Sequence, residues 1–262
     1  MSTEDINKVK DLLDYYYNFF DKKQFIETDP ISIPHKFTKK EDIEIAGFFA
    51  ATIAWGNRTS IIKTANNFCE RLDNSPFDFI TNSSEKEIYN AIKGFYYRTF
   101  KEEDALGFMH SIQNIYKNLG GLEKVFTDGY NLYETDKIKN SIIYFRNSFL
   151  KVDILERTKK HIANPSKGSA AKRINMFLRW MVRKDNNGVD FGLWNNINTK
   201  DLIIPLDVHV GNTVRKLNIL NRKANDWRAA EEVTSVLRTF DENDPIKYDF
   251  ALFGISNSKI NI

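Results

Sequence analysis

Residues 203–217, which read IIPLDVHVGNTVRKL, place one carboxylate between an apolar approach and a helix. Val210, Val214 and Leu217 recur at three- and four-residue spacing, which predicts a helix with one buried stripe. Asp207 stands where the helix begins, so its side chain can accept a backbone N–H of the next turn. The helix dipole favours the ionised carboxylate there. Asp207 is therefore either an ordinary helix cap or a fixed negative charge at the mouth of a site.

The composition of the whole chain limits the classes of protein to which it can belong. Its 262 residues are 42% hydrophobic and 28% charged, which is typical of a globular protein. No apolar run approaches the length of a membrane span, and residues 1–5 lack a signal-peptide pattern, so we expect no membrane partner and a cytoplasmic location. The single cysteine, Cys69, excludes a cysteine-built metal or iron–sulfur site within one chain and is expected to pack as a small hydrophobe. The four histidines are scattered, so we expect no metal site and no cofactor.

Hydrophobic spacing predicts an all-α chain, because no alternation of period two persists over a useful length. Helices are expected from residue 12 to about 22, and over residues 40–53, 58–72, 85–92, 105–119, 170–183, 227–237 and 248–253, with one or two more within 137–162. The helix over 40–53 is nearly all apolar and should be buried on most sides. Residues 184–201 form a long connection with little pattern.

Positive charge is concentrated in one segment. The net charge is only +3, but residues 151–184 carry ten Lys or Arg residues against two Asp or Glu residues, so that this segment is +8 and the remainder is −5. Such a segment is either the footprint of a protein that contacts phosphates or a solvated charged surface.

The helix expected over 170–183 has one apolar and one polar face. A 3.6-residue period places Lys172, Asn175, Arg179 and Arg183 together, opposite the apolar residues. Glycine and serines before the helix leave backbone N–H groups for an anion. We therefore expect this region to bind DNA phosphates. The candidate DNA-binding residues are Lys167, Gly168, Ser169, Arg173, Asn175, Arg179 and Arg183, together with His209 from the helix that follows Asp207.

A lysine-bearing loop and helix followed by PLDVHV at 205–210 resembles the helix-hairpin-helix DNA glycosylase superfamily, which includes endonuclease III and the 8-oxoguanine glycosylases. The segment IAGFFAAT at 45–52 resembles the early buried helix of that superfamily, and GFY at 94–96 its later glycine turn. The chain resembles even more closely an uncharacterised bacterial family that is placed in this superfamily. The segments that carry this resemblance are KRINMFLRWMVR at 172–183 and DPIKYDFALFG at 244–254. The resemblance covers roughly residues 40–255.

The resemblance implies a single glycosylase-like unit over residues 1–262 with two helical lobes, one over 40–160 and one over 161–262 plus the N-terminal helix. It implies base-excision repair: DNA, as a duplex with a damaged base, would be the partner, and the N-glycosidic bond would be cleaved. Asp207 takes the role of the catalytic carboxylate, and Lys172 falls where bifunctional members keep their nucleophilic lysine. Nothing indicates an obligate protein partner.

Several positions differ from the superfamily pattern. NPSKGS at 164–169 replaces the usual Leu-Pro-Gly-Val-Gly hairpin, and ATI at 51–53 stands where a glutamine that enters the DNA is common. SNSK at 256–259 lies where many members begin a four-cysteine iron–sulfur loop, so no cluster is expected. The chain between Lys172 and Asp207 is also longer than usual. Three hypotheses stay open: a glycosylase, a nucleic-acid-binding protein of the same fold without the chemistry, and a helical interaction scaffold.

The roles of individual side chains also stay open. Lys172 is either a phosphate clamp or a nucleophile, and a nucleophile would have to lose its proton near neutral pH although an ordinary lysine has a pKa of about 10.4. Desolvation or the cations Arg173 and Arg179 would have to lower that pKa. Four aromatic side chains are candidates for stacking on a flipped base, or else belong to the core. They are Trp55, Trp180, Trp194 and Tyr97. His209 either orients the site or has a structural role.

Overall fold

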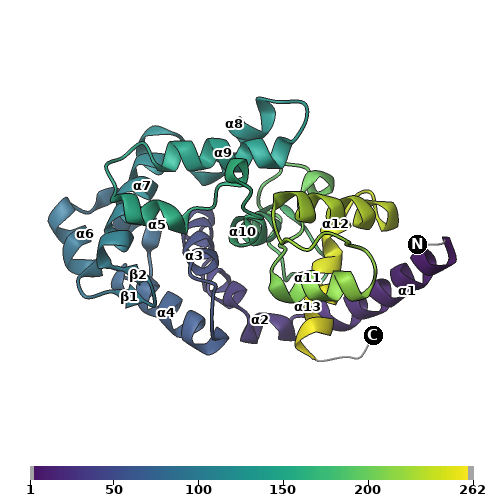
Figure 1. The fold of residues 1–262 in the computed structure, drawn as a ribbon. Helices are drawn as coiled ribbons and strands as arrows, with labels where there is room; N and C mark the ends of the chain where they lie inside the picture. Colours follow the sequence, from purple (N-terminus) through teal and green to yellow (C-terminus); the bar gives the residue numbers. More distant parts are fainter. Residues whose placement is uncertain (1–2, 259–262) are drawn as a thin grey trace. The chain divides into compact units, whose positions relative to one another are not determined.

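The computed structural model describes residues 3–258, and these residues confirm the all-α prediction (Figure 1). The chain divides into two compact units after Phe25 and after Asn164. Unit 2 runs from Ile26 to Asn164, and unit 1 combines the N-terminal segment up to Phe25 with the chain from Pro165 onward. None of the helices within residues 3–258 has the length and apolar content needed to cross a membrane.

Unit 2 contains most of the first half of the chain, and the short helix α2 (Gln24–Thr28) leads into it. Its elements, in which η marks a 3-10 helix, are η1 (Pro30–Ser32), η2 (Pro34–Lys36), α3 (Lys40–Thr52), α4 (Arg58–Arg71), α5 (Pro76–Asn82), α6 (Glu85–Ile92), β1 (Tyr96–Tyr97), β2 (Phe100–Lys101), α7 (Glu102–Asn118), α8 (Leu122–Asn131), α9 (Lys137–Phe149) and η3 (Glu156–His161).

Helix α3 forms the centre of unit 2. Every residue from Asp42 to Thr52 is buried, which confirms the expectation from its apolar sequence. Phe48 packs on Phe108 and Phe145, with ring centroids 6.0 and 5.4 Å apart, and Phe49 stacks on Phe68. Aromatic rings of this kind bury large apolar areas, so the α3 core holds the surrounding helices in place.

The turn expected after Gly94 is a small β-hairpin. Strands β1 and β2 pair antiparallel, with Tyr97 opposite Phe100, and Arg98 in the turn has a left-handed backbone with φ of 55°. The Tyr97 hydroxyl donates to the backbone oxygen of Trp55 at 2.7 Å, which ties the hairpin to the end of α3. Two-residue strands are too short to leave a period-two pattern in the sequence.

Unit 1 begins with α1 (Thr3–Phe20), and its remaining elements follow Asn164. These elements are η4 (Pro165–Lys167), α10 (Lys172–Val182), η5 (Thr199–Asp201), α11 (Val208–Lys216), α12 (Trp227–Phe240), η6 (Pro245–Lys247) and α13 (Tyr248–Asn257). Helix α1 lies beside α13, and α11 also packs against α13 (Figure 1). A Cβ on Gly254 would lie 2.1 Å from the Phe20 ring, so glycine is what permits the close approach of α1 and α13.

Helix α10 is the buried helix of unit 1, and its residues from Ile174 to Val182 are all buried. The connection over residues 184–201 covers its C-terminal half. The backbone N–H of Phe191 donates to the Trp180 oxygen at 2.8 Å, and that of Trp194 donates to the Met181 oxygen at 2.9 Å. Residues 184–201 are therefore ordered although their sequence has little pattern, and backbone hydrogen bonds hold them against α10.

Candidate functional site

Asp207 is the N-cap of α11, as its sequence predicts. Its Oδ1 accepts the backbone N–H of Val210 at 2.9 Å, and the Asn225 amide donates to its backbone oxygen at 3.3 Å. Ile203 to Leu206, before it, are buried, whereas 26% of the Asp207 side chain stays exposed. The carboxylate is thus held by a buried segment on one side and a helix on the other, with one edge facing solvent.

Lys172 is the first residue of α10, and its ammonium lies beside this carboxylate. Lys172 Nζ is 3.8 Å from Asp207 Oδ2, and the lysine side chain is also 26% exposed. Ala171 before it has a left-handed backbone with φ of 49° and no side chain that caps the helix. The structure therefore brings together the two residues expected to be catalytic, at the N-terminal ends of two helices, despite the long chain between them.

The segment before Lys172 differs from the expected helix start. We expected a helix from Ala170, but residues 165–167 form a 3-10 turn that ends at Gly168, where φ is 85°. Gly168 accepts the backbone N–H of Trp227 at 3.0 Å, and Ser169 forms a β-bridge with Asp226. The exposed residues Lys167, Gly168 and Ser169 are thus fixed to the start of α12 rather than being the first turn of the basic helix.

The prediction that α10 presents a phosphate-binding face is wrong for three of the predicted residues. Asn175, Arg179 and Arg183 are 2%, 4% and 1% exposed, so they cannot contact the phosphates of a bound nucleic acid. The Asn175 amide instead donates to the Ala170 oxygen at 3.0 Å. The helical period places these side chains on one face correctly, but that face points into unit 1.

Aspartates neutralise the two buried arginines. Arg183 donates to Asp190 at 2.9 Å and, through Nε, to Asp244 at 2.9 Å. Arg183 Nη1 lies 3.4 Å from Asp185 and Nη2 lies 3.7 Å from Asp21, and both carboxylates are fully buried. Sequence reasoning missed all of these partners, although the acidic motif DPIKYD at 244–249 was visible as part of the resemblance.

Arg179 links this cluster to the Lys172–Asp207 pair. Its Nε donates to Asp190 at 3.2 Å, and its Nη1 donates to Asp249 of α13. Burial raises the pKa of Asp249 to about 6 against the opposing effects of Arg179 and Lys172, and the Asp207 and Asp190 charges raise it further. The charges of Lys172 and Asp207 therefore act on Asp249, which makes it the second carboxyl group of the candidate site.

The cations that face solvent near the site are fewer than the sequence predicts. Lys172 and Arg173 are partly exposed, and Lys167 and His209 are exposed. Burial lowers the pKa of the Arg173 guanidinium to about 10, so it stays charged at neutral pH. Val208, next to Asp207, is 62% exposed and adds an apolar contact at the mouth of the site.

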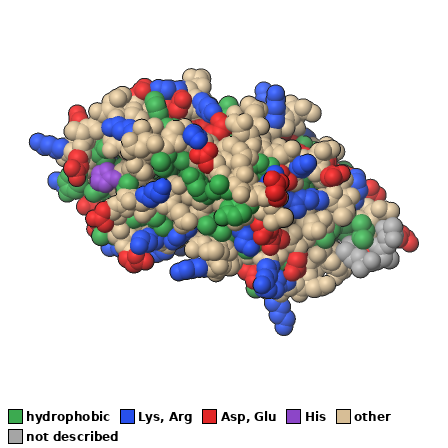
Figure 2. Space-filling view, turned by 90° about the horizontal axis from the view of Figure 1, so that it is seen from above, with side chains coloured by type: hydrophobic (Ala, Val, Ile, Leu, Met, Phe, Trp, Pro, Cys, Tyr) green, Lys and Arg blue, Asp and Glu red, His purple; other side chains and the backbone are tan. Residues whose placement is uncertain are grey.

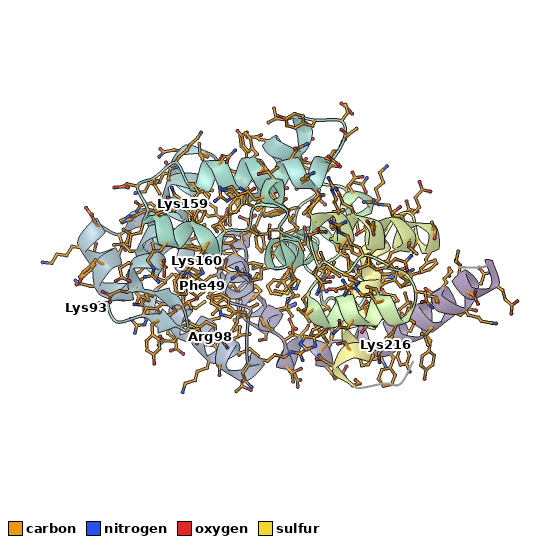
Figure 3. The ribbon with its side chains drawn as sticks, in the orientation of Figure 1. Phe49, Lys93, Arg98, Lys159, Lys160 and Lys216 are labelled. Carbon is orange, nitrogen blue, oxygen red and sulfur yellow. The ribbon has the colours of Figure 1, made fainter. Side chains whose placement is uncertain are left out.

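The basic segment over 151–184 is divided between the two units. Lys151, Arg157, Lys159 and Lys160 belong to unit 2, and the other six basic residues belong to unit 1. On the face that Figure 2 shows, Lys and Arg side chains are interspersed with Asp and Glu side chains. Figure 3 labels Lys159 and Lys160 on η3, and Lys216 at the end of α11 away from Asp207.

Three of the four aromatic candidates for base stacking belong to the core, and one of them is Tyr97, which is 6% exposed. Trp180 and Trp194 are 0% and 1% exposed, and Trp194 packs edge-on against Phe177. Trp55 and Tyr97 contact one another in unit 2, with ring centroids 5.4 Å apart. Within the described part of the chain, no group of three or more His, Cys, Asp or Glu side chains is arranged to hold a metal ion.

Comparisons with known proteins give one match. Residues 29–258 match the model of a family described as "Protein of unknown function (DUF2400)". Neither the curated proteins nor the solved structures contain a significant match to this sequence.

Proposed function

We propose that this chain, which belongs to the DUF2400 family of proteins of unknown function, is a DNA N-glycosylase that removes a damaged base. The observation that carries the proposal is the distance of 3.8 Å between Lys172 Nζ and Asp207 Oδ2, both partly exposed at helix N-termini. A fixed carboxylate beside a cation suits a reaction in which positive charge develops on a sugar that is joined to phosphates.

In the proposed reaction the bond between the sugar C1′ and the base nitrogen breaks and the base leaves with the electron pair. Water adds to C1′ and loses a proton, and the departing base nitrogen takes up a proton, so that the products are the free base and a sugar with a hydroxyl at C1′. The Asp207 carboxylate stabilises the cationic sugar and orients the water. Lys172 acts as the phosphate clamp rather than as the nucleophile, because its ammonium is paired with the Asp207 carboxylate. Arg179 is not available to activate Lys172, because it is itself paired with the carboxylates of Asp190 and Asp249.

A panel of duplex oligonucleotides carrying oxidised, alkylated and deaminated bases tests this proposal by single-turnover base release. We expect Asp207→Asn to slow release by about 100-fold or more, because the charge that stabilises the transition state is lost. Asparagine is as good an N-cap as aspartate, so α11 should survive. The matched control is Asp226→Asn, which changes the N-cap of α12 and should leave the rate unchanged.

The second candidate is a nucleic-acid-binding protein that has kept the fold and lost the chemistry. The capping bond from Val210 to Asp207 favours it, since this bond explains the carboxylate without any reaction. For such a protein no oligonucleotide of the panel would lose a base, and Asp207→Asn would leave both binding and stability unchanged.

A further inference from the structure

Asn225 lies in the loop between α11 and α12 and contacts the residue that carries the candidate carboxylate. Its side-chain Nδ2 donates to the backbone oxygen of Asp207 at 3.3 Å. The Oδ1 of the same amide accepts from Arg215 Nη2 at 2.6 Å. A carbonyl oxygen can only accept and a guanidinium can only donate, so the amide fits in one orientation. Asn225 therefore joins Asp207 to the last turn of the helix that Asp207 caps.

Arg215 fixes the loop in which Asn225 lies. Its Nε donates to the backbone oxygen of Arg222 at 2.9 Å, and its Nη2 donates to that of Lys223 at 2.8 Å. These bonds run from a helix to consecutive residues of the loop, so they hold the loop backbone immediately before Asn225. The Asn225 amide is thus presented to Asp207 from a fixed support.

The same stretch of chain also holds the segment before Lys172. The backbone N–H of Trp227, two residues after Asn225, donates to the Gly168 oxygen at 3.0 Å. Gly168 belongs to the short segment that leads into α10, of which Lys172 is the first residue. The chain around Asn225 therefore contacts both sides of the Lys172–Asp207 pair.

Gly211 leaves the space that the Asn225 amide occupies. A Cβ on Gly211 would lie 2.5 Å from Asn225 Oδ1 and 2.9 Å from Arg215 Nη1, and both distances are too short for a side-chain carbon. Gly211 lies within α11, where alanine would favour the helix more than glycine does. The glycine is therefore explained by the amide that it accommodates rather than by the helix.

We propose that Asn225 is a positioning residue that fixes the Asp207 backbone, and with it the Asp207 carboxylate, beside the Lys172 ammonium. The capping bond from Val210 uses Oδ1 of Asp207, and Oδ2 faces Lys172. The direction of Oδ2 depends on the Asp207 backbone, whose oxygen accepts from both Asn225 and the Gly211 N–H. The inference deepens the proposed function and rests on it, because a carboxylate held in place stabilises a cationic sugar better than a mobile one.

A zero-length crosslink between Lys172 and Asp207 tests this inference without any nucleic acid. A water-soluble carbodiimide activates the carboxylate, the amine displaces the activating group as a urea, and an amide forms only where the two side chains are in contact. The full-length chain is treated near neutral pH, and peptide mass spectrometry gives this crosslink relative to that between Lys247 and Asp241. Lys247 and Asp241 lie 2.6 Å apart, are 18% and 28% exposed, and serve as the internal reference.

In Asn225→Ala we expect the crosslink ratio to fall by about threefold or more, because the Asp207 backbone loses a hydrogen-bond donor and its carboxylate lies beside the ammonium less often. Gly211→Ala should lower the ratio in the same way, since the added Cβ displaces the amide. Asn212→Ala is the matched control. It is the same substitution at an exposed position of α11, and its ratio should equal that of the wild type.

An unchanged ratio in a chain that is folded by circular dichroism would overturn the inference, as would an equal fall in Asn212→Ala. Gly211→Ala decides the question if Asn225→Ala does not fold. In base release, Asn225→Ala should slow the single-turnover rate about tenfold while the affinity for the duplex stays within about twofold, because the exposed cations are unchanged. A ratio that falls as expected in a chain that releases no base would support the inference and count against the proposed function alone.

Discussion

Asp207 and Asp226 show how two similar residues differ in their surroundings. Both are N-caps that accept a backbone N–H three residues ahead, at 2.9 and 3.0 Å. The partner of Asp226 is Arg222, four residues away, and this local pair lowers the pKa of Asp226 to about 2. The partner of Asp207 is Lys172 on another helix. A cap needs no such distant cation, so the pairing with Lys172 is what sets Asp207 apart as a site residue.

The raised pKa of Asp249 predicts how stability depends on pH. Its pKa is about 6 in the folded chain against an ordinary value of 3.8, so the folded state binds this proton more tightly than the unfolded state. The resulting stabilisation is complete below about pH 3.8 and is lost as the pH rises through about 6. We expect the free energy of unfolding, measured with urea, to fall by about 1 kcal/mol between pH 5 and pH 7.5 because of Asp249.

Asp249→Asn should remove this part of the pH dependence, because an amide does not titrate. Asp21, Asp190 and Asp244 also have raised pKa values caused by burial, so a smaller slope of the same sign should persist in the variant. Identical pH profiles for the wild type and Asp249→Asn would show that Asp249 does not change its ionisation on folding.

Individual site residues differ in how far the sequence predicted them. Asp207 was predictable because capping is local: a carboxylate before an apolar-periodic helix is enough. Lys172 came from the family resemblance, and only the fold shows that it reaches Asp207. Asp190 was missed because it lies in the connection that has little sequence pattern, and Asp249 because its arginine is 70 residues away.

At the scale of the element, the sequence predicts correctly which side chains of α10 share a face, but not that this face is buried. The period of 3.6 residues determines which side chains share a face, and Asn175, Arg179 and Arg183 do share one. It does not determine what covers that face, and here the cover is made by the 184–201 connection and by α13. A polar stripe on a helix was therefore read as a surface when it is a buried ionic network.

The burial of Arg183 leads to a prediction about stability rather than about DNA binding. Arg183→Ala leaves several buried carboxylates without their cation, so we expect a loss of about 3–5 kcal/mol in the free energy of unfolding. Lys184→Ala, at the exposed neighbouring position, should change stability by no more than about 0.5 kcal/mol. Urea denaturation of both variants is the measurement. A stable Arg183→Ala chain that binds DNA more weakly would restore the phosphate-contact role.

Helix limits were predictable where the sequence contains a capping motif. Residues 85–92 were expected to be helical, and α6 spans this range because Ser84 and Glu87 form a capping box. The start of α10 was placed two residues early. Its N-cap is Ala171 in a left-handed conformation, which alanine rarely adopts, so nothing in the sequence marks the boundary.

For the whole molecule, the division into two units changes the meaning of the basic segment. Four of its ten cations lie in unit 2, and two of the remaining six, Arg179 and Arg183, are neutralised inside unit 1. The charge count along the sequence was correct, but it could not show how many charges face solvent. Near the site, the cations with exposed surface are Lys167, Lys172 and Arg173.

This small set of cations predicts a modest salt dependence of DNA binding. Each phosphate contact contributes a slope of about −0.9 to a plot of log K against log salt concentration, so three contacts in unit 1 give about −3, to which any contacts of unit 2 would add. Lys172→Ala should make the slope shallower by about one. Fluorescence anisotropy with a duplex oligonucleotide, at salt concentrations between about 50 and 300 mM, measures this slope. Binding that does not depend on salt would favour the interaction-scaffold hypothesis.

The central claim, that the Asp207 carboxylate stabilises positive charge on a sugar, can be tested without knowledge of the damaged base. Two duplexes are compared that differ at one abasic position, which carries either a cationic pyrrolidine or a neutral tetrahydrofuran ring. We expect the wild-type chain to bind the pyrrolidine duplex at least about tenfold more tightly, about 1.4 kcal/mol, and Asp207→Asn to lose this preference. Equal affinity of the wild type for both duplexes would contradict the claim.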